Sequence, residues 1–171
     1  MPTRRPVLVQ AARFAALATM SWVAQGQVSA QVIGQVTKQG NMRLPAPKSL
    51  PEALQAALQK RQPLVLMVSL DGCPFCKIVR EHYLVHMARD DGLQVMQIDM
   101  QSKAVLTDWA GQATTHAALI EKLGINVAPT LCFYGQGGKE VAERLVGLSS
   151  VDFYGAYLDA RLATARNAAG R

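Results

Sequence analysis

Apolar side chains beyond residue 49 follow two spacings, one typical of buried strands and the other typical of helices. Leu64–Leu70 is a nearly continuous apolar run, bounded by Pro63 on one side and by Asp71 and Gly72 on the other. A short apolar run between turn residues predicts a strand that is buried on both faces of a sheet. Three further segments predict strands, namely Leu93–Met100, Asn126–Tyr134 and Glu140–Val146.

Helical spacing of the apolar residues predicts four helices. Ser49 is suited to be an N-cap, with Pro51 and Glu52 in the first turn, so a helix is expected from there to about Lys60. Two more are expected, one from the Cys-Pro-Phe-Cys segment to about Arg89 and one from Thr115 to Leu123. In the last helix, capped by Ser149 or Ser150, the apolar positions are Val151, Tyr154, Leu158, Leu162 and Ala165.

The order of these elements, α-β-α-β-α-β-β-α, indicates a single α/β domain over residues 49–171. Gln101–Gln112 is polar and is expected to be a long connection. The glycine-rich segment Gly135–Gly138 is expected to be the turn between the last two strands. The length of 171 residues fits one domain, and the sequence shows no internal repeat.

The first thirty residues have the order of a secretory signal. Two arginines stand near the start, Phe14–Ala24 is uncharged and mostly apolar, and Val28-Ser29-Ala30 offers small residues for cleavage. The apolar stretch spans about 16 Å as a helix, roughly half of a membrane's hydrocarbon core, which disfavours an uncleaved anchor. We therefore expect cleavage near Ala30 and export, followed by a flexible lead-in over residues 31–48.

The distribution of charge excludes nucleic-acid binding as the main function. The net charge is +6, but residues 50–171 carry 12 basic and 12 acidic residues, so the excess lies before the folded body. A nucleic-acid-binding protein needs its basic charge on that body. Half of the residues are hydrophobic, which excludes a wholly disordered chain, and three cysteines are too few for a disulfide-stapled miniprotein.

The segment Cys73-Pro74-Phe75-Cys76 stands between a predicted strand and a predicted helix, where a Cys-x-x-Cys pair is typical of redox chemistry. Cys73 is expected at the helix N-terminus, where unpaired backbone N–H groups and the helix dipole stabilise a thiolate and lower its pKa. Pro74 loses no hydrogen bond at the first helical position. Cys76 lies one turn further along, so Cys73 is the expected attacking thiol and Cys76 the resolving thiol.

With these residues the chain resembles the thioredoxin superfamily over about residues 50–166. The resemblance rests on the first strand, the Cys-Pro-Phe-Cys motif, Ala128-Pro129-Thr130 before a strand, the Gly137-Gly138 hairpin and the closing helix. It implies a thioredoxin fold, with a central mixed four-stranded sheet flanked by helices and, here, an extra N-terminal helix. It also implies a cis peptide bond before Pro129, which faces the cysteines, and a backbone at Ala128 that binds the substrate chain.

The export signal and the Trp109-Ala110-Gly111 insertion make the chain similar to periplasmic thioredoxin-like proteins, including those of sulfur-oxidation clusters. This resemblance implies protein substrates with disulfides or thiols, and a membrane or periplasmic electron partner. Two positions depart from thioredoxin: Gly72 replaces its usual Trp, and Met67 replaces the buried Asp that helps to move the proton of the second cysteine. The direction of electron flow therefore stays open, with reduction preferred on the resemblance alone.

Four other residues have competing interpretations. His82 and His86 could complete a zinc site, but His86 lies about 15 Å along the helix from Cys76, which Zn bonds of about 2.0–2.3 Å do not span, so a solvated or half-buried helix face is favoured. Cys132 is expected to pack as a small hydrophobe, with a regulatory or intermolecular thiol as the alternative. Trp109 is expected to pin a long loop, with substrate contact as its alternative.

Together these observations predict a secreted thiol–disulfide oxidoreductase that uses its own Cys73–Cys76 dithiol, with no bound cofactor and no metal. Two alternatives stay open. One is a thioredoxin-fold binding or chaperone module whose disulfide is structural, which resists mild reductant and shows no lowered thiol pKa. The other is a metal-delivery protein that uses the same two cysteines, which stoichiometric metal after purification would reveal.

Overall fold

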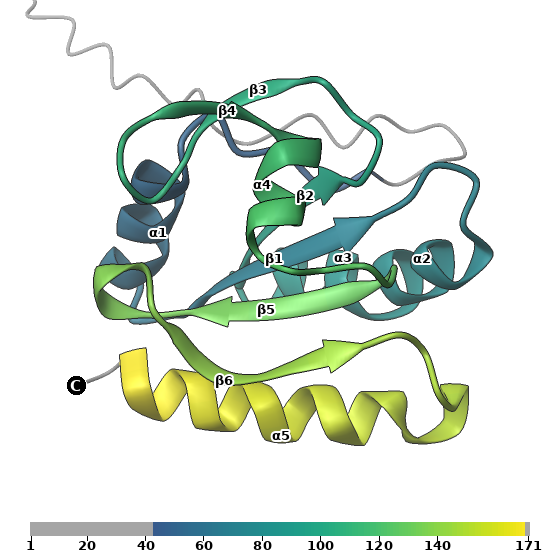
Figure 1. The fold of residues 1–171 in the computed structure, drawn as a ribbon. Helices are drawn as coiled ribbons and strands as arrows, with labels where there is room; N and C mark the ends of the chain where they lie inside the picture. Colours follow the sequence, from purple (N-terminus) through teal and green to yellow (C-terminus); the bar gives the residue numbers. More distant parts are fainter. Residues whose placement is uncertain (1–42, 170–171) are drawn as a thin grey trace, which may run out of the picture. The chain divides into compact units, whose positions relative to one another are not determined.

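The computed structural model describes residues 43–169. Its central sheet has the strand order β2-β1-β5-β6, shown in Figure 1. β1 pairs in parallel with β2 and antiparallel with β5, and β5 pairs antiparallel with β6. These strands are β1 (Leu64–Ser69), β2 (Gln94–Asp99), β5 (Thr130–Tyr134) and β6 (Glu140–Val146). The predicted mixed four-stranded sheet is confirmed.

Helices cover both faces of this sheet. α1 (Leu50–Gln59) and α4 (His116–Lys122) pack on one face. The other face carries α5 (Val151–Ala169) and the helix that follows the cysteine motif, which consists of α2 (Pro74–Val79), a π-helical turn η1 (Arg80–Leu84) and α3 (Val85–Asp90). The predicted N-terminal helix is confirmed as α1, whose N-cap Ser49 accepts a hydrogen bond from the Glu52 N–H at 3.3 Å.

Alternation along β1 divides the core into two layers. Val65 and Met67 pack with α2 and α5, whereas Leu64, Leu66 and Val68 pack with α1 and α4. All six residues of β1 are buried, as the continuous apolar run predicted. The strand that leads to the cysteine motif is therefore anchored from both sides.

The polar connection after β2 contains structure that the sequence analysis did not predict. β3 (Val105–Thr107) pairs antiparallel with β4 (Ala113–Thr115). The Asp108 carboxylate accepts hydrogen bonds from the N–H groups of Ala110 and Gln112 at 2.9 and 3.0 Å, and from Lys122 Nζ at 2.9 Å. Strands of three residues are too short to show a clear alternation of apolar and polar side chains, so the pattern gave no signal for them.

One predicted limit and one predicted core position are wrong. β5 begins at Thr130 rather than at Asn126, because Thr130 is the first residue paired with both neighbouring strands. In α5, the predicted apolar positions Tyr154, Leu158, Leu162 and Ala165 are buried, but Val151 is exposed. Val151 is the first residue of that helix, one turn before the part that packs on the sheet. A turn, η2 (Gln136–Gly138), joins β5 to β6 near the predicted place.

Within the predicted lead-in, two of the six residues that the structure describes, 43–48, are packed against the domain. Leu44 and Pro47 are buried, and the Pro45 carbonyl accepts a hydrogen bond from the Gln97 N–H at 2.8 Å. The flexible segment therefore does not extend to residue 48.

The predicted signal peptide and residues 31–42 lie outside the described residues. Between residues 43 and 169, no helix has the length and apolar character required to cross a membrane.

Candidate active site

Cys73 and Cys76 form a disulfide at the start of α2. Cys73 is the N-cap of this helix, Pro74 is its first residue, and the Cys76 N–H donates a hydrogen bond to Cys73 Sγ at 3.1 Å. The Cα atoms of the two cysteines are 5.3 Å apart. The expected arrangement of strand, motif and helix is therefore present, with one backbone N–H at the helix start, that of Cys76, directed at the first sulfur.

The two cysteines differ in exposure. Cys73 is partly buried, whereas Cys76 is 0 % exposed and belongs to the core layer that contains Met67 and Val79. An incoming substrate can therefore reach Cys73 but not Cys76. Met67, the residue that stands in place of thioredoxin's buried Asp, is itself fully buried, so β1 offers no carboxylate beneath the disulfide.

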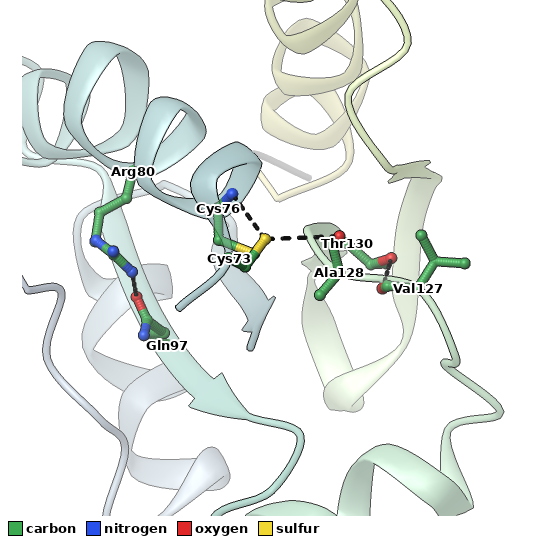
Figure 2. Close-up of a disulfide and its surroundings, with 7 residues drawn as sticks. All are labelled: Cys73, Cys76, Arg80, Gln97, Val127, Ala128 and Thr130. Carbon is green, nitrogen blue, oxygen red and sulfur yellow. Dashed lines mark hydrogen bonds between the residues drawn. A yellow bond between two sulfur atoms is a disulfide. The ribbon is translucent and has the colours of Figure 1, made fainter. Parts of the chain in front are cut away.

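The loop before β5 lies against Cys73. The Ala128–Pro129 peptide bond is cis, and the Ala128 carbonyl oxygen lies 4.0 Å from Cys73 Sγ, as Figure 2 shows. Thr130 Oγ1 donates a hydrogen bond to the Val127 carbonyl at 2.7 Å, which holds the loop in place. Because Ala128 precedes the first paired residue of β5, it lies outside the sheet ladder, where another chain can approach it.

Exposed apolar side chains lie on the segments that adjoin the disulfide. Phe75, between the cysteines, is 54 % exposed, and Val127 is 40 % exposed. Val146, at the end of β6, is 60 % exposed and pairs with Thr130 through the backbone. The next residue, Gly147, donates its N–H to the Pro129 carbonyl at 2.7 Å. Apolar surface of this kind on a folded protein is typical of an interaction site.

A pocket of about 460 Å³ opens on another side of Cys73, and the loop that carries Pro129 does not line it. The ends of β1 and β2, the first turns of α2 and Arg43 form its walls. One terminal nitrogen of Arg80 donates a hydrogen bond to Gln97 Oε1 at 2.9 Å (Figure 2). Burial lowers the pKa of the Arg80 guanidinium from its ordinary value. The negative charges of Glu81 and Asp99 oppose this shift, and the positive charge of Arg43 adds to it.

The sequence analysis did not single out these pocket residues. The one available signal was the spacing of Lys77 and Arg80, which follow Cys76 at one and four residues along the helix. Gln97 and Asp99 reach the pocket only because β2 pairs in parallel with β1. No local pattern reports that pairing.

The structure also places the residues that had competing interpretations. His82 and His86 are exposed on the helix surface, as predicted. Cys132 is 0 % exposed in β5, and burial raises the pKa of its thiol to about 11, which supports a packing role. Trp109 packs against Tyr134, with ring centroids 4.6 Å apart, and so pins the loop between β3 and β4. Among residues 43–169, no three His, Cys, Asp or Glu side chains gather as a metal site would require.

Comparison with known proteins finds solved structures that are similar to this chain. Similar solved structures include thioredoxin O2 from Arabidopsis thaliana in its oxidised state, with 19% identity over 69% of this chain and 93% of that one, and a TM-score of 0.48. Trxlp from Edwardsiella tarda EIB202 is 23% identical over 66% of this chain and 96% of its own, with a TM-score of 0.46. A protein described as DsbH oxidoreductase is 18% identical over 76% and 94%, with a TM-score of 0.49.

No curated protein sequence matches the chain. Residues 50–161, more than half of its length, match the family of the thioredoxin-like domain. That segment runs from α1 into α5 and contains both the Cys-Pro-Phe-Cys motif and Pro129. The chain therefore belongs to the thioredoxin superfamily.

Proposed function

We propose that this protein is an exported thiol–disulfide oxidoreductase that acts on protein disulfides, with Cys73 as the attacking thiol and Cys76 as the resolving thiol. One observation carries the proposal: an accessible sulfur at a helix start is bonded to a buried one, and it faces the Ala128–Pro129 loop. Membership of the thioredoxin superfamily supports the reaction class.

In the reducing direction, the Cys73 thiolate attacks one sulfur of the substrate disulfide, and the other substrate sulfur leaves as a thiolate. The Cys76 thiolate then attacks Cys73 Sγ, which releases the second substrate thiol and restores the Cys73–Cys76 disulfide. Two electrons pass from the protein dithiol to the substrate. The Cys76 N–H, directed at Cys73 Sγ, favours negative charge on that sulfur. Oxidation of a substrate dithiol follows the same steps in reverse.

Protein substrates are favoured by the surface around Cys73. The exposed side chains of Phe75, Val127 and Val146 offer an apolar contact area, and the Ala128 backbone offers hydrogen bonds to an extended chain. Return of the disulfide to the dithiol requires an electron donor. We assign that role to a membrane or periplasmic partner, because the sequence of residues 1–30 has the order of a secretory signal.

The assignment of the two cysteines is tested with serine variants. Cys73→Ser is expected to reduce insulin reduction to the uncatalysed rate, because no accessible nucleophile remains. Cys76→Ser is expected to accumulate mixed disulfides, visible on non-reducing gels, because Cys73 can attack but its adduct is not resolved. Cys132→Ser serves as the control that should show neither effect. Full activity in Cys73→Ser, or equal adducts in Cys73→Ser and Cys76→Ser, would contradict the assignment.

The reduction potential of the Cys73–Cys76 pair decides the direction. Thioredoxin has a potential of about −270 mV and the oxidant DsbA about −120 mV. We expect a value near the thioredoxin end, measured by equilibration with glutathione or dithiothreitol buffers. A value near −120 mV identifies an oxidase instead. A disulfide that resists both buffers, with unreactive thiols after forced reduction, would contradict a redox function and favour a structural bond.

A further inference from the structure

The pocket beside Cys73 contains more positive than negative groups. Arg43, Lys77 and Arg80 line it, against Asp71 and Asp99. The four ion pairs that occur among residues 43–169 involve none of these five side chains. One oxygen of Asp99 is already engaged, since it accepts a hydrogen bond from the Gln101 N–H at 3.3 Å. None of the three cations therefore forms an ion pair within the described part of the chain, although the negative charges of Glu81 and Asp99 favour the charged form of Arg80.

Arg80 has hydrogen-bonding capacity that the protein does not use. Its contact with Gln97 occupies one terminal nitrogen, while its Nε is buried and has no partner among the described residues. Arg43 adds a second guanidinium to the same pocket, and its positive charge opposes that of Arg80. A bound anion would provide an acceptor for the Arg80 guanidinium and reduce the repulsion between the two charges.

We propose that this pocket binds the carboxylate of a low-molecular-weight disulfide while Cys73 attacks its sulfur. The proposal rests on the proposed redox function and adds a second substrate class to it. The volume of about 460 Å³ suits a small molecule. The pocket also lies apart from the surface assigned to proteins: in Figure 2, Arg80 and Gln97 are on one side of Cys73, and Ala128 is on the other. Protein disulfides and small disulfides would therefore react with the same sulfur, Cys73 Sγ, and would bind on different sides of it.

The reaction balances without any further reagent. The Cys73 thiolate displaces one thiolate from the small disulfide, and Cys76 displaces the second from the mixed disulfide. The small disulfide gains two electrons and becomes two thiols, while the protein dithiol loses two electrons and becomes the Cys73–Cys76 disulfide. A single turnover of protein that has been reduced and freed of reductant is enough to follow it.

A charge series of three disulfides of similar size tests the proposal. The probes are 3,3′-dithiodipropionate, with two carboxylates, bis(2-hydroxyethyl) disulfide, which is neutral, and cystamine, with two ammonium groups. Because the attacking group is a thiolate, simple charge repulsion makes the dicarboxylate the slowest of the three. We expect the opposite for the dicarboxylate. It should react about tenfold or more faster than the neutral probe if the pocket supplies an ion pair.

Variants of the pocket show whether these residues cause the preference. Arg43→Gln and Arg80→Gln should each lower the ratio of the dicarboxylate rate to the neutral rate by about tenfold, a loss expected for one charge-assisted contact. Arg43 is exposed, so its variant avoids the risk of misfolding that a change at the more buried Arg80 carries. Arg89→Gln, which removes an exposed guanidinium on α3, is the control and should keep the wild-type ratio.

Several outcomes overturn the inference. One is a wild-type dicarboxylate rate no higher than the neutral rate. Another is an equal loss for all probes and insulin, which would show that the arginines act on Cys73 in general. A variant that slows the reduction of insulin but keeps the ratio of the dicarboxylate rate to the neutral rate would assign the pocket to protein chains instead. If one of these outcomes occurs while the wild type still reduces insulin, only the inference about the pocket fails. If the wild type reduces no disulfide at all, the proposed redox function itself fails.

Discussion

At the scale of single residues, the surroundings of the three cysteines give their sulfur atoms different accessibility and reactivity. Cys73 is accessible at a helix start, Cys76 is buried behind it, and Cys132 is buried in the middle of β5. Burial raises the pKa of the Cys132 thiol from 9.0 to about 11. At neutral pH such a thiol is almost entirely protonated and is a poor nucleophile. Cys132 therefore does not compete with the active-site pair.

The raised pKa of Cys132 predicts a dependence of stability on pH. A protonated thiol held by the fold stabilises the protein fully below pH 9, the ordinary pKa, and this stabilisation is lost as the pH rises from 9 to about 11. The full loss is on the order of 3 kcal/mol. Urea unfolding of the oxidised protein at pH 8–11 should show a steeper decline for the wild type than for Cys132→Ala. Parallel declines would show that Cys132 ionises in the folded state at its ordinary pKa.

At the scale of elements, the β3–β4 hairpin and the η2 turn hold each other through Trp109. Gly138 has φ +69°, and a Cβ there would lie 2.8 Å from Trp109 Cε3, so the ring packs directly on the glycine backbone. Gly137 has the same φ, but a Cβ there would meet nothing within 4 Å. The two glycines thus share one backbone conformation and differ only in their neighbour.

This pair provides a matched test of the packing. Gly137→Ala is expected to cost about 1 kcal/mol because alanine is strained at positive φ. Gly138→Ala is expected to cost about 1–3 kcal/mol more, because the added methyl group displaces Trp109. Chemical denaturation, with tryptophan fluorescence as the probe, measures both losses. Equal losses would mean that Trp109 moves away freely and does not pin the loop.

At the scale of the whole molecule, strand pairing assembles the site. β1 and β5 are antiparallel, and Val68 near the end of β1 pairs with Thr130 at the start of β5. The segment that follows β1 and the segment that precedes β5 must therefore meet at one edge of the sheet. This brings Cys73 to Ala128, although 55 residues separate them in sequence. The parallel partner β2 brings Gln97 and Asp99 to the same edge and forms the pocket.

Export is a prediction for the whole chain. When the full-length protein is expressed in a Gram-negative bacterium, the periplasmic form is expected to begin near Gln31, because small residues at positions 28 and 30 suit the signal peptidase. Intact-mass measurement of the purified protein detects the loss of the first thirty residues. Ala30→Arg should leave the longer precursor, and a periplasmic or purified wild type that retains its first residues would contradict the prediction.

The sequence by itself determined the features that depend on near neighbours. The Ser49 cap, the buried run that forms β1, the helix start at Cys73 and the period of α5 all follow from residues within one or two turns of each other. Such signals act through local backbone geometry and the side on which apolar groups must lie. The spacing of Cys73 and Cys76 and their place between a strand and a helix are signals of this local kind, so the two cysteines of the proposed redox pair are identifiable from the sequence.

The position of Pro129 came from the resemblance to a family, since spacing alone predicted an ordinary proline at the start of a strand. The tertiary structure alone decided which distant groups share the space around Cys73. Arg43 comes from the segment before α1, Arg80 from the helix after the motif, and Gln97 from β2. Their meeting depends on long-range strand pairing, whose energy is spread over the whole sheet and leaves no mark on the residues nearby in sequence.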